Sequence, residues 1–124
     1  RGVLWCQGES DAQSIDDGTV AVPAYRGALR RLVAAFRREL DDDALPVFLF
    51  YPAQPRSGDT EGFAAVREAQ ADLAAHDDNV HLVYEDTVTF PERGLMRDDH
   101  HFTQAGYNEM GQVGAGNVVA ALDD

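Results

Sequence analysis

The sequence predicts a single α/β domain over residues 1–124, built on a parallel sheet that is covered by helices on both faces. Three short apolar runs alternate with segments whose apolar residues recur at helical spacing. Each pair of successive strands is separated by a segment long enough for a helical crossover, so the strands should run parallel. A chain of 124 residues can bury one core. It has no apolar run near the roughly 18 residues of a membrane-spanning helix.

The first half of the chain supplies two strands and one helix. Gly2–Trp5 has the pattern of a short strand, and Asp11–Thr19 has the composition of a polar loop. Pro23 opens a helix that ends at the acidic run Asp41–Asp43. The apolar positions of this helix are Tyr25, Leu29, Leu32, Val33, Phe36 and Leu40. Val47–Tyr51 is a continuous apolar run, which is typical of a strand buried on both faces.

The second half supplies two helices and a third strand. A helix over about Glu61–His76 precedes the strand Val80–Tyr84, and a long irregular loop then extends to His101. Thr103 is predicted to cap a last helix that reaches about Leu122. Glycine lowers helix propensity, so the glycines of this helix predict close packing against a neighbour. They are Gly106, Gly111, Gly114 and Gly116.

The composition limits the possible partners and the redox chemistry. The chain has 10 basic and 22 acidic residues, and its formal net charge of −12 repels nucleic-acid phosphates. All ten basic residues are arginine and 15 of the acids are aspartate, a bias that fits a GC-rich genome or a salt-adapted protein. Cys6 is the sole cysteine and cannot form an internal disulfide. No signal peptide is visible, which leaves localisation open between cytoplasmic and secreted.

Two polar clusters follow predicted strands, and the carboxyl ends of parallel strands share one edge of a sheet. Gln7–Asp11 follows the first strand, and Asp98–His101 follows the third. Asp98 precedes His101 by three residues, a spacing at which a carboxylate can orient the imidazole and leave its Nε2 free as a base. The alternative is that Asp98 and Asp99 are ordinary loop and capping residues.

Two other kinds of site are less well supported by the pattern. A metal site at His100, His101 and the two aspartates is disfavoured because adjacent side chains point in different directions, so we expect no metal. Gly8–Ala12 (GESDA) invites comparison with a nucleophile elbow centred on Ser10, with Asp and His following as in α/β-hydrolases. Position 12 is alanine, however, and no helix is predicted to begin at Ser10, so a polar loop residue is the expected role.

Arg67 and Gln70 fall inside the apolar arc of their predicted helix, so both side chains should point inward. A buried guanidinium needs a carboxylate partner, and Glu9 is the natural candidate because its loop lies at the same edge of the sheet. The alternative is an arginine that extends along the helix edge to solvent.

Three sequence blocks together resemble the sialate O-acetylesterase-like carbohydrate esterases of the SGNH (GDSL) hydrolase superfamily. The blocks are GVLWCQGESDA at the start, Val66–Gln70, and Asp98–Thr103 with the following Gly106-Tyr107 and Met110-Gly111. They occur in the family's order and span nearly the whole chain. Cys6 departs from the pattern, because the family usually has an aromatic residue there.

The resemblance implies a flavodoxin-like three-layer α/β/α fold, the SGNH hydrolase fold, whose N-terminal strand and helix are missing from this chain. It implies His101 as general base, Asp98 as its orienting partner and Gln7 as a side-chain donor to the oxyanion. Glu9 and Arg67 are expected as a supporting pair behind these groups. The family's serine block, G-Q-S-N, is absent from the sequence. The nucleophile is therefore expected outside this chain, in the remaining N-terminal part of the domain.

The expected function is a serine esterase that removes O-acetyl groups from a carbohydrate or a sialic acid, as part of a longer chain and with no cofactor. Its expected partners are the acetylated carbohydrate and the rest of the domain, with no nucleic acid and no membrane. The first alternative is a truncated or degenerate SGNH module that binds a glycan or a protein without catalysis. The second is an α/β-hydrolase that uses Ser10.

Overall fold

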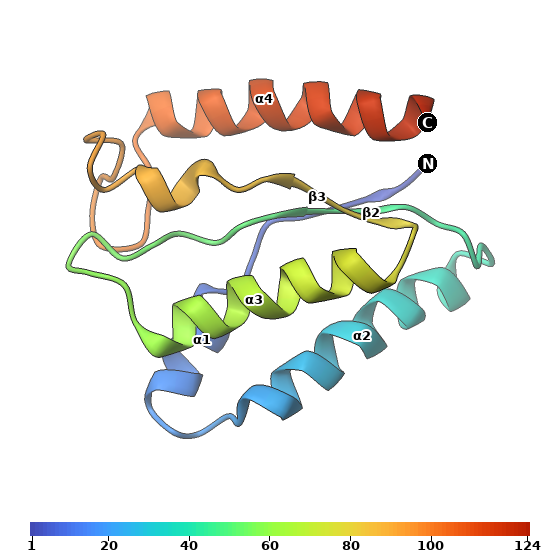
Figure 1. Ribbon diagram of the computed structural model, residues 1–124, viewed down its shortest axis with the longest axis horizontal. Coiled ribbons are helices and arrows are strands. Elements are labelled where there is room, and N and C mark those ends of the chain that lie inside the picture. Colours follow the sequence, from blue (N-terminus) through green and yellow to red (C-terminus); the bar gives the residue numbers. More distant parts are fainter.

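The computed structural model describes residues 1–124 and shows a parallel three-stranded sheet between two helical layers (Figure 1), which confirms the predicted fold class. The strands are adjacent in chain order: β1 (Val3–Trp5), β2 (Val47–Phe50) and β3 (Val80–Tyr84). The helices are α1 (Glu9–Asp16), α2 (Val22–Glu39), α3 (Glu61–His76) and α4 (Gln104–Asp123), with a 3-10 turn at Asp86–Thr89. None of these helices combines the length and the apolar character needed to cross a membrane.

The sheet separates two apolar clusters, one on each face. Helices α1, α2 and α3 lie on one side of the sheet and α4 lies on the other (Figure 1). The first cluster includes Tyr25, Leu29, Val33, Val47, Leu49, Phe63, Val66, Leu73 and Val80. The second includes Phe48, Phe50, Val83, Tyr84, Phe90, Met96 and Phe102. Alternate side chains of β2 thus enter opposite clusters, which explains why this strand is apolar at every position.

Residues Glu9–Asp16 form helix α1, so the predicted loop at Asp11–Thr19 is wrong over most of its length. The helix is short and mostly polar, with Ala12 as its buried residue, and contacts with α3 hold it in place. Asp16 accepts hydrogen bonds from the Gly62 backbone N–H at 2.7 Å and from the Thr60 hydroxyl at 2.6 Å. A Cβ at Gly62 would collide with α1, so glycine allows the two helices to pack closely.

Helix α4 begins as predicted, because the Thr103 hydroxyl accepts a hydrogen bond from the Gly106 N–H at 3.2 Å. The predicted close packing of its glycines holds at two of the four positions. A Cβ at Gly114 would collide with an aromatic ring of β2, and one at Gly106 would lie 3.1 Å from a ring in the loop after β3. Gly111 and Gly116 face open space, so they lower helix propensity without a packing role.

Candidate active site

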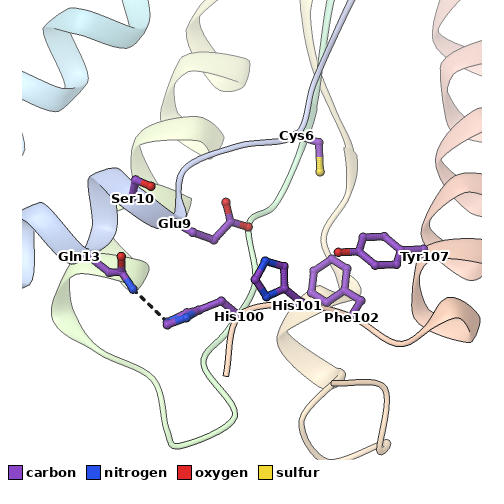
Figure 2. Close-up of a pocket in the computed structure, with 8 residues that line it drawn as sticks. All are labelled: Cys6, Glu9, Ser10, Gln13, His100, His101, Phe102 and Tyr107. Atoms are coloured by element: carbon purple, nitrogen blue, oxygen red, sulfur yellow. Dashed lines mark hydrogen bonds between the residues drawn. The ribbon is translucent and has the colours of Figure 1, made fainter. Parts of the chain in front are cut away.

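The loops that follow β1 and β3 meet at the carboxyl edge of the sheet, where they line a cavity of about 420 Å³ (Figure 2). Helix α1 contributes one wall, the loop before α4 contributes the histidines, and the first turns of α4 complete the opposite wall. The lining residues are Cys6, Glu9, Ser10, Gln13, His100, His101, Phe102 and Tyr107. The two polar clusters of the sequence thus lie together in space.

Asp98 and His101 form a hydrogen-bonded pair at this cavity. The Nδ1 of His101 lies 2.9 Å from both carboxylate oxygens of Asp98. Asp98 also accepts the backbone N–H groups of His100, at 2.9 Å, and of His101, at 2.8 Å. These hydrogen bonds favour the ionised carboxyl and hold the pKa of Asp98 well below its usual range. A carboxylate can only accept, so the proton of His101 sits on Nδ1 and its Nε2 is free.

Glu9 joins the loops at the carboxyl edge. One carboxylate oxygen accepts the Gly8 backbone N–H and the other accepts the Ala53 backbone N–H, each at 3.1 Å. Gly8 follows β1 and Ala53 follows β2, so this carboxylate holds the ends of the two strands in a fixed relation. Glu9 therefore supports the cavity through backbone contacts.

The predicted ion pair between Glu9 and Arg67 is wrong. Arg67 and Gln70 are buried as helical phase predicted, with exposed fractions of 8% and 0%. The guanidinium of Arg67, however, donates to Asp59 in the loop before α3. The oxygens of Glu9 are already taken by backbone N–H groups. Helical phase decides that Arg67 is buried, but the path of the loop directly before α3 decides which carboxylate it meets.

Gln7 lies beside the cavity of His101 without lining it. Its backbone oxygen accepts a hydrogen bond from the Gln70 side-chain amide at 3.1 Å. Gln7 instead lines a second cavity of about 230 Å³, between β1 and α2, together with residues that include Trp5 and Tyr25. The structure does not bring its amide to His101, so the role of oxyanion donor stays a prediction.

His100 lines the cavity and Asp99 holds the adjoining loop, which are roles that the sequence analysis did not predict for them. The His100 ring stacks on Phe63, with centroids 5.6 Å apart, and its Nε2 lies 3.4 Å from the amide nitrogen of Gln13 (Figure 2). Asp99 accepts the Ser57 backbone N–H at 2.7 Å and the Ser57 hydroxyl at 3.0 Å, which lowers the pKa of Asp99. Asp99 thereby ties the loop after β2 to the histidine loop. These contacts join distant segments, and no local spacing in the sequence signals them.

Two other side chains in the cavity carry a potential nucleophile. Cys6 is exposed at the cavity, but the protein atoms around it partly desolvate its sulfur, and with the charge of Glu9 this raises the pKa of the thiol to about 11. Cys6 is therefore a protonated thiol at neutral pH, and the thiolate is the reactive form. Ser10 is exposed, and no hydrogen bond joins it to His100 or His101. No group of three or more His, Cys, Asp or Glu side chains is placed to hold a metal ion.

Comparison with protein families identifies one that covers the site. A family model described as carbohydrate esterase, sialic acid-specific acetylesterase, matches residues 1–120. This range includes every residue that lines the cavity. Comparisons with curated proteins and with solved structures gave no match.

Proposed function

Because the chain belongs to the carbohydrate esterase family of sialic acid-specific acetylesterases, we propose that it removes O-acetyl groups from a carbohydrate. The observation that carries this proposal is the pair of Asp98 and His101 at the cavity. The imidazole is held through Nδ1 by an ionised carboxyl and presents a free Nε2. Serine esterases use this arrangement as their general base.

In the proposed reaction, Nε2 of His101 takes the proton of a serine hydroxyl while the serine oxygen attacks the acetyl carbonyl carbon. The imidazolium then gives this proton to the departing sugar oxygen, and an acetyl-serine remains. His101 next takes a proton from water as the water oxygen attacks the acetyl carbon, and then gives this proton to the departing serine oxygen, so that acetate leaves and the serine hydroxyl is restored. The ionised Asp98 stabilises the imidazolium in both steps. Gln7 is the proposed donor to the oxyanion, and its amide must turn from the second cavity toward His101 to donate.

We propose that the serine comes from a further part of the same domain, since the serine block of the family is absent from these residues. Strand β1 pairs with β2 on one side and leaves its other edge open, and Leu4 in β1 is 66% exposed. An additional strand on this edge would pair the free backbone groups, and a helix following it could cover Leu4, which points to the face of the sheet opposite Val3 and Trp5. If this strand ran parallel to β1, its carboxyl end would lie at the same edge of the sheet as His101.

The test uses the chain together with the residues encoded before Arg1. We expect this longer protein to hydrolyse an aryl acetate, and a serine-reactive fluorophosphonate to label a serine outside residues 1–124, located by peptide mass spectrometry. Labelling at Ser10 would instead support the α/β-hydrolase alternative. A folded protein that shows neither hydrolysis nor labelling would support a non-catalytic module that binds a glycan or a protein, an alternative favoured by the missing serine block.

A further inference from the structure

We propose that Gln70 is a positioning residue of the esterase, which fixes the peptide group between Gln7 and Gly8. Together with Glu9 it holds this peptide in one orientation and so places the Gln7 side chain for its role as oxyanion donor. This inference rests on the proposed function and deepens it at the same site. The carbonyl oxygen of the peptide accepts from the Gln70 amide nitrogen, and its N–H donates to the Glu9 carboxylate, each at 3.1 Å.

The burial of Gln70 is costly, and its hydrogen bond to Gln7 gives it a purpose. Its side chain is 0% exposed, so no further part of the domain can contact it. Its amide oxygen, Oε1, has no hydrogen-bond partner. A buried amide oxygen that loses water without gaining a partner destabilises a fold, and an apolar side chain of the same size would not carry this cost. The group that the amide serves is the carbonyl of Gln7.

Gly8 allows the turn after β1 to lie directly against α3. A Cβ at this residue would lie 2.7 Å from a side-chain carbon of Val66 and 3.5 Å from the amide nitrogen of Gln70. A larger residue would therefore lift the peptide from α3 and out of reach of the amide. Val66 and Gln70 are four residues apart on one helix, so they lie side by side and form a floor under the turn.

The two side chains that hold this peptide group also oppose its reversal. A peptide group before a glycine can reverse at little steric cost, because glycine accepts both signs of φ. The C=O and N–H of a trans peptide point in opposite directions, so reversal would turn the carbonyl oxygen from Gln70 toward Glu9. A carboxylate repels a carbonyl oxygen and has no proton to donate to it. Gln70 and Glu9 therefore favour the same orientation.

The fixed peptide limits what this turn can offer to an oxyanion. The Gly8 N–H is used by Glu9, so it is not free to act as a backbone donor. The proposed donor is the side-chain amide of Gln7, whose Cα is bonded to the fixed carbonyl carbon. With this backbone held, the amide leaves the second cavity by side-chain rotation alone. A donor whose backbone is fixed in advance loses less freedom in the transition state, which raises kcat.

The first experiment compares hydrolysis of an aryl acetate by the longer protein that carries the serine and by its Gln70→Met variant. Methionine has a similar length and no N–H, so it fills the core and leaves the Gln7 carbonyl unheld. We expect kcat to fall about tenfold and KM to stay within about twofold, because a misplaced donor acts on the transition state. Unchanged kcat in the folded variant would overturn the inference and leave the esterase function standing.

The matched control is Leu73→Ala, at a buried position of the same helix that lines the groove between α2 and α3. It should lower the melting temperature and leave kcat within about twofold, because a cavity in the core does not reach the turn. A loss of kcat equal to that of Gln70→Met would mean that any damage to α3 has this effect, and would overturn the inference.

The second experiment asks whether Gln70 acts through Gln7. Gln70→Met is introduced into the Gln7→Ala variant, where it should lower kcat by less than about twofold, because the side chain that it places is gone. An equal factor in both backgrounds would mean that the two residues act independently, and would overturn the inference. No hydrolysis by the unsubstituted longer protein would overturn the proposed function and the role of Gln70 with it.

A measurement on the unsubstituted protein needs neither catalysis nor a variant that folds. NMR follows the exchange of the Gln70 side-chain amide protons with solvent, and the exposed Gln112 of α4 is the control. The Gln70 protons should exchange at least about a hundredfold more slowly, because the amide is buried and bonded to the Gln7 carbonyl. Equal exchange rates would show that this hydrogen bond does not hold the turn, and would overturn the inference.

Discussion

Each edge of the sheet carries a pair of oppositely charged groups. The two pairs differ in how buried they are and in how far apart their residues lie in the chain. At the amino edge, Arg37 of α2 donates two hydrogen bonds to Asp77, at 2.7 and 3.0 Å, and their side chains are 16% and 24% exposed. At the carboxyl edge, His101 and Asp98 are 58% and 50% exposed. The first pair joins residues 40 apart in the chain, and the second joins residues three apart.

This difference separates a structural pair from a reactive one. A shielded pair between distant segments holds those segments together, because the charges are partly desolvated and their geometry is bidentate. An exposed pair between near neighbours stabilises the fold little, because water screens the charges. Its exposure instead leaves Nε2 of His101 open to a substrate. Loss of a charged group should therefore reduce stability at the amino edge and activity at the carboxyl edge.

The largest expected effect is at His101. His101→Ala should lower kcat on an aryl acetate roughly 10³-fold or more, because the serine loses its base. The melting temperature should change little, since the side chain is exposed. The measurement is steady-state kinetics of the longer protein, and His100→Ala is the matched control. If the two variants lose equal activity, or His100→Ala loses more, the assignment of the base is wrong.

A second variant tests whether burial, and not position in the sheet, makes a pair structural. Asp59 and Arg67 lie toward the carboxyl edge, but the guanidinium is buried. Asp59→Ala should lower the free energy of unfolding by about 2–3 kcal/mol, because Arg67 keeps a buried charge without its partner. Urea denaturation measures the effect. A double-mutant cycle should show coupling between Asp59 and Arg67, and additivity within about 0.5 kcal/mol between Glu9 and Arg67.

A variant of Gln7 tests whether a side chain at the carboxyl edge stabilises the transition state. Gln7→Ala should lower kcat about 10²-fold and leave KM nearly unchanged, because an oxyanion donor acts mainly in the transition state. A variant that mainly raises KM would indicate substrate binding instead. Unchanged kcat and KM would mean that Gln7 stays in the second cavity during the reaction.

The smallest expected effect is at the amino edge and depends on pH. The hydrogen bonds from Arg37 lower the pKa of Asp77 below its value in the unfolded chain. The resulting stabilisation is complete above the unfolded pKa of about 3.9 and is lost as pH falls through the folded pKa. Asp77→Asn should lower the free energy of unfolding by about 1–2 kcal/mol at pH 7 and much less near pH 2. Urea denaturation at both pH values checks this, and an equal difference at both would contradict the linkage.

Features that depend on residues close together in the chain could be predicted from the sequence. Val47–Tyr51 is apolar at every position, which predicts a strand with both faces buried, and helical phase correctly turns Arg67 and Gln70 inward. The pairing of Asp98 with His101 was also accessible, because a spacing of three residues in a turn before a capped helix brings the two side chains together. Short chain separation leaves few possible geometries for such contacts.

Other contacts depended on the path of segments far apart in the chain, and only the tertiary structure decided them. Helix α1 packs on α3 through Asp16 and Gly62, although its own sequence is short and mostly polar. Arg67 meets Asp59, eight residues before it, and not Glu9, because the Glu9 carboxylate accepts backbone N–H groups from the ends of two strands that lie far apart in the chain. Gln7 lines the second cavity because α2, which is distant in the chain, packs beside the end of β1. Residue type and phase determine whether a side chain is buried, but its partner depends on where the remaining elements and their loops pack.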